Sequence, residues 1–210
     1  MSASINNPVL NLFRELALVP DSSILWNELG RHQRSLGSPT PALVAAARAV
    51  SIDPSFAANL LSLGVMLYES GYRLDAIDRF LESLVSMPAS AEAWLALGVA
   101  EKTATRSARA YDCLIRALTL REVYPEASAQ IAALFFQMRR PEDALAAATQ
   151  AVHQSPQSLP AWATQGQVLR MLLRPLAAEP CFQRCVVWQP AMAEYWVNLG
   201  IVRQMQDFFD

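Results

Sequence analysis

The 210-residue sequence predicts an all-α fold: a solenoid of antiparallel helix hairpins, with five full repeats and a single helix at each end. Tryptophans recur at spacings of 68, 68 and 34 residues, at Trp26, Trp94, Trp162 and Trp196. A period near 34 is typical of helix–turn–helix repeats. The 53% hydrophobic content is rich in Ala, which favours helices that pack closely.

One register accounts for the chain without an insertion. The repeats it predicts are 23–56, 57–90, 91–124, 125–158 and 159–192, followed by a half repeat, 193–210. Position 8 is always small: Gly30, Gly64, Gly98, Ala132, Gly166 and Gly200. Position 20 is always alanine: Ala42, Ala76, Ala110, Ala144 and Ala178. Position 32 is proline except in the third repeat: Pro54, Pro88, Glu122, Pro156 and Pro190.

Each recurring residue type has a physical reason. Positions 4, 7, 8 and 11 share one face of the first helix of a repeat, helix A. Small residues at positions 8 and 20 let helix A approach the second helix, helix B. Proline at position 32 ends helix B. Gly37 and Gly71 are expected in turns with positive φ, and Pro39 and Pro141 in the first turn of helix B.

Two repeats depart from the pattern. Because Glu122 replaces proline, helix B of the third repeat is expected to continue to near Tyr124. Pro180 lies inside the expected helix B of the fifth repeat, so that helix is expected to start late or to kink. At the ends, residues 8–19 read as a capping helix B. Residues 193–210 read as a helix A without its partner, which suggests a fragment of a longer protein.

The recurring residues resemble the tetratricopeptide repeat (TPR) family over nearly the whole chain, 1–210, which we take as one domain. The resemblance implies a right-handed superhelix whose concave side is lined by helix A, with ligands at positions 2, 5, 6, 9, 12 and 13. Residues 193–200 are similar to repeats in bacterial O-linked N-acetylglucosamine transferases. The sequence lacks the carboxylate clamp of chaperone-tail binders, and only Asn198 fits the asparagine ladder of those transferases.

Positions 5 and 9 are apolar in repeats 2 to 4, where a solvated groove would be polar. This predicts an interaction surface, although helix B edges or chain outside the sequence are alternative covers. Position 12 alternates cations and aromatics, a pattern that fits either a stacked ladder or a solvated edge. The candidate groove comprises Leu61, Val65, Tyr68, Leu95, Val99, Lys102, Ala129, Ala133, Phe136 and Arg170.

The leading functional hypothesis is a protein-interaction module that binds a peptide or a helix in this groove. One alternative is the substrate-recruiting arm of a larger enzyme, such as a glycosyltransferase. Another is a structural scaffold that forms homo-oligomers through the half repeat, with Trp196, Phe208 and Phe209 in the contact.

Other classes of function find little support in the sequence. The net charge of −2 argues against nucleic-acid binding, and no apolar run approaches the roughly 20 residues that span a membrane. We expect no signal peptide, because residues 1–7 are polar and lack a basic and an apolar region, and three cysteines without framework spacing favour the cytoplasm. Catalytic motifs are absent, so we expect neither enzymatic activity in this chain nor a cofactor or metal. Cys181 and Cys185 are expected in the core.

Overall fold

The computed structural model describes residues 8–207, which form twelve α-helices and no strand. The helices pair as antiparallel hairpins, so the predicted all-α solenoid fold is confirmed. The chain divides into two compact units, residues 1–104 (unit 1) and 105–210 (unit 2). The division falls in the turn of the third predicted repeat.

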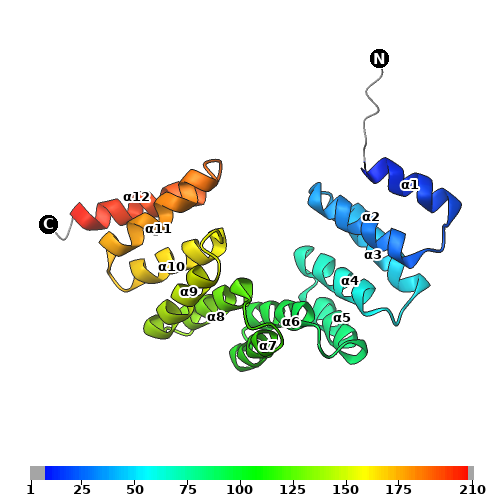
Figure 1. Ribbon diagram of the computed structural model, residues 1–210, viewed down its shortest axis with the longest axis horizontal. Coiled ribbons are helices and arrows are strands. Elements are labelled where there is room, and N and C mark those ends of the chain that lie inside the picture. The colour runs from blue at the N-terminus through cyan, green and yellow to red at the C-terminus, as the bar shows by residue number, and fades with distance from the viewer. Residues whose placement is uncertain (1–7, 208–210) are drawn as a thin grey trace, which may run out of the picture. The chain divides into compact units, whose positions relative to one another are not determined.

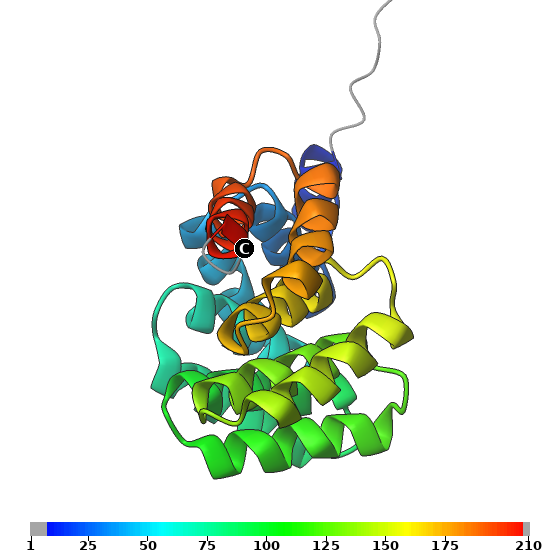
Figure 2. The same ribbon diagram turned by 90° about the vertical axis from the view of Figure 1, so that its left-hand side faces the viewer.

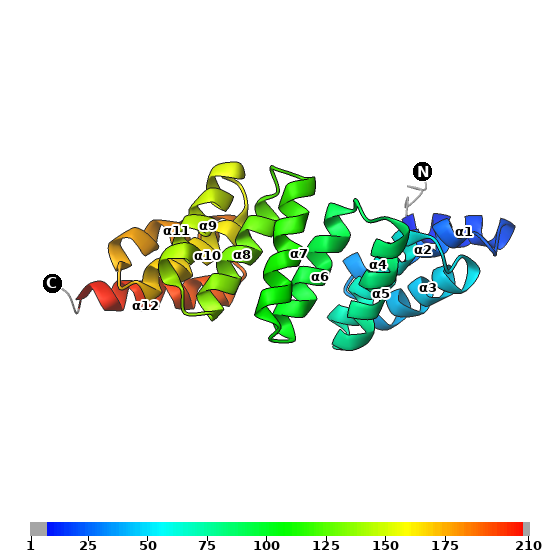
Figure 3. The ribbon, with the colours of Figure 1, turned by 90° about the horizontal axis from the view of Figure 1, so that it is seen from below.

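Each unit stacks consecutive helices (Figures 1 and 3). Unit 1 contains α1 (Pro8–Leu18), α2 (Ser23–Ser35), α3 (Pro39–Ile52), α4 (Ala57–Glu69), α5 (Arg73–Ser86) and α6 (Ala91–Thr103). Unit 2 contains α7 (Ser107–Leu120), α8 (Pro125–Gln137), α9 (Pro141–Gln154), α10 (Leu159–Met171), α11 (Pro175–Trp188) and α12 (Ala193–Asp207). Within unit 2, α10 packs between α8 and α12, and α11 covers α10 and α12 (Figure 2).

Every helix A begins at the first residue of a predicted repeat, from Ser23 in α2 to Ala193 in α12. Serine caps three of these helices. For example, the Ser22 hydroxyl accepts a hydrogen bond from the backbone N–H of Leu25 at 3.3 Å. Pro39 and Pro141 are the first residues of α3 and α9, as predicted.

The two helices of a hairpin touch at positions 8 and 20. The alanines at position 20 are at most 1% exposed. A Cβ built on Gly64 would lie 2.5 Å from the ring of Phe80, and one on Gly166 would lie 2.8 Å from the ring of Phe182. Both rings are fully buried. A side chain at either glycine would therefore force a packed ring to shift.

A tryptophan ties each of four repeats to the turn before it. The indole Nε1–H of Trp26 donates to the carbonyl of Pro20 at 2.8 Å. The bond recurs in both units at 2.8–2.9 Å, joining Trp94 to Pro88, Trp162 to Pro156 and Trp196 to Pro190. Position 4 thus fills space between helices and also donates a hydrogen bond to a backbone carbonyl in the turn that follows helix B.

The fourth repeat makes the same link with different residues. Ser128 replaces tryptophan, and its hydroxyl is 3.0 Å from Oε1 of Gln154. The Gln154 amide donates to the carbonyl of Glu122, the residue at position 32, at 3.3 Å. A glutamine on α9 therefore takes over the donor role of the missing indole.

The turn from helix A to helix B has a positive φ at position 15 in all five hairpins. Gly37 and Gly71, predicted for this role, have φ of 71° and 91°. The next three repeats place a residue with a side chain there: Thr105, Arg139 and Leu173, with φ of 61°, 58° and 55°. This left-handed conformation costs a residue with a Cβ about 1–2 kcal/mol.

One expectation about helix B is wrong; of the two alternatives expected for α11, the late start is wrong and a kink at Pro180 stays a prediction. Helix α7 ends at Leu120, not near Tyr124, because Arg121 leaves the helix with φ −141°, as the residues before proline do in other repeats. Tyr124 instead caps α8, whose first residue is Pro125. Helix α11 starts at Pro175, so it does not start late. Pro180 is accommodated inside it, on the exposed side.

Helix α12 is attached to α11 through one carboxylate. Glu179 accepts hydrogen bonds from Arg203 Nε at 2.9 Å and from Gln206 Nε2 at 3.0 Å, both on α12. Gln183 on its own helix adds a third at 3.0 Å. The bonds from Gln206 and Arg203 hold the pKa of Glu179 below its ordinary value.

Replacing Gly64 by alanine should destabilise the protein by about 1–2 kcal/mol, since the new methyl group overlaps the Phe80 ring. Gly200 is the matched control, because nothing lies within 4 Å of a Cβ built there. Gly200→Ala should stabilise by up to about 1 kcal/mol through helix propensity alone. Chemical denaturation measures both changes. Equal effects of the same sign would contradict the packing.

Gln154→Ala should cost about 1–2 kcal/mol, because it leaves the buried Ser128 hydroxyl and the Glu122 carbonyl without their partner. Gln150→Ala, on the exposed side of the same helix, should change the free energy of unfolding by less than about 0.5 kcal/mol. Thermal unfolding of the two variants tests the substituted link. It would be refuted by equal melting temperatures.

The Glu179 contacts should make the stability depend on pH. A carboxylate whose pKa is lowered by folding stabilises the native state above its ordinary pKa, and this stabilisation is lost as the pH falls through the lowered value. The melting temperature of Glu179→Gln should therefore lie below wild type near about pH 7, and the gap should narrow toward about pH 3. Glu194→Gln, on the exposed side of α12, should show no such gap.

Candidate functional site

Six of the predicted groove residues lie on two neighbouring helices of unit 1. Leu61, Val65 and Tyr68 share one side of α4, and the equivalent side of α6 carries Leu95, Val99 and Lys102. All six side chains are half-buried. We call the four aliphatic ones, Leu61, Val65, Leu95 and Val99, the unit 1 face.

Lys102 lies at the C-terminal end of this part of α6. Burial lowers the pKa of its ammonium group, because a partly desolvated cation is less stable than one in water. The structure therefore places a partly desolvated charge one helical turn from Val99.

The four groove residues predicted in unit 2 differ in exposure. Ala133, Phe136 and Arg170 are half-buried. Ala129 is only 4% exposed and belongs to a core cluster with Ala151 and Ala161. Its assignment to a ligand-facing surface is wrong, because a small side chain at position 5 lets the next repeat pack over it.

Phe136 and Arg170 come together in unit 2, where they line a hollow of about 620 Å³. Helix α8 contributes Phe136, and α10 contributes Arg170 and Met171. The rest of the lining consists of Gln137 of α8, the turn residues Arg139 and Leu173, and Met205 of α12. We call this site the α8–α12 hollow. Its volume lies in the range of ligand sites, about 300–1,000 Å³.

Sequence reasoning missed Arg139, Leu173 and Met205. A signal was available for the two turn residues, because they occupy position 15, where the first two repeats have glycine. The signal for Met205 was weaker: it occupies position 13, where the second repeat has the charged residue Glu69.

The first member of the predicted cation–aromatic ladder has an acidic partner. Arg34 Nε lies 3.1 Å from Oε2 of Glu69, so α2 and α4 are joined by an ion pair. The arginine–aromatic contacts found among residues 8–207 lie at other positions, such as Arg184 over Trp162 at 4.4 Å. The stacked ladder is therefore not built at Arg34.

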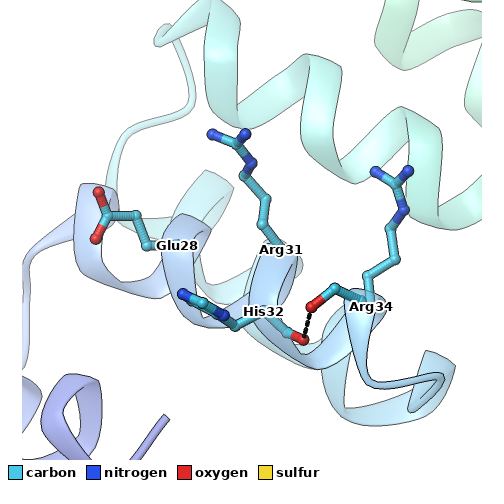
Figure 4. Close-up of a pocket in the computed structure, with 5 residues that line it drawn as sticks. Glu28, Arg31, His32 and Arg34 are labelled. Carbon is cyan, nitrogen blue, oxygen red and sulfur yellow. Dashed lines mark hydrogen bonds between the residues drawn. The ribbon is translucent and has the colours of Figure 1, made fainter. Parts of the chain in front are cut away.

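A second hollow lies on α2, a site that sequence reasoning did not single out. Glu28, Arg31, His32 and Arg34 line it, and Arg34 points toward α4 (Figure 4). His32 is exposed, and its backbone carbonyl accepts a hydrogen bond from Ser35 at 2.7 Å. Charges of both signs share this surface.

The predicted self-association surface is only partly described. Trp196 is 51% exposed and its neighbour Val197 is 59% exposed, while the Trp196 indole is bonded to Pro190. Phe208 and Phe209 lie outside the described residues. Homo-oligomer formation stays a prediction.

The three cysteines are buried, as expected of core residues. Burial raises the pKa of Cys181 and of Cys185 to about 11, so neither is a thiolate at neutral pH. Across residues 8–207, no three His, Cys, Asp or Glu side chains gather as a metal site would require. Each helix in the same range is too short or too polar to span a membrane.

Solved structures share this fold. A chain of the APC/C hetero-tetramer Cut9–Hcn1 superimposes with a TM-score of 0.87 at 15% identity, over 97% of this chain and 40% of that one. MamA matches with a TM-score of 0.62 at 25% identity, over 80% of this chain and 98% of MamA. YrrB, a TPR protein with an unusual peptide-binding site, matches with 0.59 at 18% identity, over 88% and 95%.

No protein-family model matches the sequence, and no curated protein matches it. The similarity of residues 193–200 to transferase repeats stays a prediction, as does a bacterial, cytoplasmic setting. A thermophilic TPR protein of Thermus thermophilus superimposes with a TM-score of 0.77 at 16% identity, over 87% of this chain and 99% of that one. The chain thus has the helical solenoid fold of tetratricopeptide repeat proteins.

Proposed function

We propose that the chain is a protein-interaction module that binds a peptide or a helix of a partner on the ligand-facing side of its A helices. The unit 1 face is the observation that carries the proposal. It places four aliphatic side chains on two adjacent helices, each of them still partly open to water. Contiguous apolar surface of this kind is typical of interaction sites.

The fold supports the same proposal. YrrB binds peptide by its description, and it shares the arrangement of hairpins with this chain. In the two hairpins of unit 1, α2–α3 and α4–α5, helix B packs against only one side of helix A. The other side of helix A remains for a ligand, and its residues are free to vary without disturbing the contacts at positions 8 and 20.

The size of the face sets the expected affinity. Burial of one leucine or phenylalanine of a ligand contributes roughly 1.5–3 kcal/mol. Three or four such anchors, less the entropic cost of association, correspond to a dissociation constant of roughly micromolar order. Such affinities suit transient assembly.

The double variant Leu95→Asp and Val99→Asp should weaken binding by about tenfold or more, because it places two charges where apolar ligand side chains would be buried. Binding is measured by calorimetry, with peptides selected on the wild-type chain from a random library displayed on phage. Val85→Asp is the control: Val85 is 83% exposed on helix B of the second repeat, and its replacement should leave affinity unchanged. Unchanged affinity of the double variant, with an intact helical circular dichroism spectrum, would reject the unit 1 face.

A further inference from the structure

The α8–α12 hollow combines an apolar lining with two cations. Phe136, Met171, Leu173 and Met205 supply the apolar part. Arg139 and Arg170 supply the positive charge, Gln137 adds an uncharged amide, and none of these lining residues is acidic. Nε of Arg170 is buried and has no hydrogen-bond partner among residues 8–207. The Arg170 guanidinium therefore lacks an acceptor that would offset its partial desolvation, and the rest of this half-buried group lines the hollow.

The first repeat shows one partner that an arginine at this position can have. Arg34 and Arg170 both occupy position 12. Arg34 pairs with Glu69, at position 13 of the following repeat. The equivalent residue opposite Arg170 is Met205, which lines the hollow and carries no charge. The fifth repeat therefore keeps the cation of this ion pair and lacks the anion.

Nearby carboxylates are already engaged. Asp143 lies 2.8 Å from Nε of Arg140, and Glu142 lies 3.6 Å from an Nη of Arg174. Arg139, held in the turn with φ of 58°, has no ion pair in the part of the chain that the structure describes. Two positive charges thus remain at the hollow after local pairing.

We propose that the α8–α12 hollow binds an Asp or Glu side chain of an extended partner peptide, with Arg170 as the carboxylate-binding residue. A large apolar side chain next to that acidic residue packs on Phe136 and Met205. Arg139 adds a second cation at the exposed rim. This assignment rests on the proposed peptide-binding function and names the ligand chemistry of one site within it.

The test uses a random peptide library displayed on phage, selected in parallel on the full chain and on the variants Arg170→Met and Arg34→Met. Displayed peptides are fused at their C-termini, so enrichment of acidic residues reports side-chain carboxylates. Wild type and Arg34→Met should enrich Asp or Glu beside a large apolar residue. Arg170→Met should lose this preference. It should also weaken a selected acidic peptide by about tenfold or more, as measured by fluorescence anisotropy.

Met205→Glu provides an independent test that does not depend on removing a buried side chain. It restores the partner that Arg34 has, so the introduced carboxylate should pair with Arg170. The melting temperature should rise or stay equal, while affinity for the selected acidic peptide should fall by about tenfold. Met205→Gln, of similar size but uncharged, should bind more tightly than Met205→Glu.

The outcomes separate this site from the general function. Binders without an acidic preference, or an acidic preference that survives in Arg170→Met, would overturn the site and leave the peptide-binding module standing. A library that yields no binder on the folded wild-type chain would overturn both. Loss of acidic selection in Arg170→Met but not in Arg34→Met, together with weaker binding of the selected acidic peptide to Met205→Glu, would support the assignment.

Discussion

The structure depends on the close contact between the two helices of each hairpin. At Gly64 and Gly166 the backbone of helix A lies directly against a buried phenylalanine ring of helix B. No residue with a side chain fits there without a shift. This contact commits one side of α4 and of α10 to the partner helix. The candidate residues Leu61, Val65 and Arg170 of these two helices are half-buried, and each still exposes part of its side chain.

A second constraint joins successive repeats within each unit. The tryptophan at position 4 donates a hydrogen bond to the backbone carbonyl six residues earlier, in the turn after helix B, as Trp94 does to Pro88. One side chain thereby spans the helix–helix space and fixes the incoming turn. Because the bond is local in sequence, its geometry can repeat with the 34-residue period.

The fold was predictable because these contacts use residue types that stand out in a sequence. Glycine at position 8 and tryptophan at position 4 mark the register, and the helices start where it places them. The errors came from local compensation. Helix α7 ends at Leu120 without a proline at position 32, with Arg121 in the extended conformation that the C-cap residue adopts in other repeats, and Gln154 binds the carbonyl of Glu122 just beyond it. Pro180 reads as a helix breaker, yet its exposed position lets α11 continue around it.

The candidate site was less predictable than the fold. Phe136 and Arg170 were predicted because the family resemblance puts position 12 on the ligand-facing side, and both line one hollow in the structure. Ala129 was misplaced, since periodicity alone does not show how closely the next repeat packs over an alanine. Arg139 and Leu173 lie in a turn, where helical periodicity says nothing about direction. The charge left at Arg170 emerges only by comparison with Arg34, whose partner is known from the structure.

The Ser128–Gln154 pair also bears on how the sequence of a repeat can change. Ser128 is 1% exposed, and Gln154 is in hydrogen-bond contact with it. Loss of the glutamine alone leaves the Ser128 hydroxyl and the carbonyl of Glu122 without this partner. The two positions, 26 residues apart, therefore act as one unit, so the effect of a substitution at either one depends on the residue at the other.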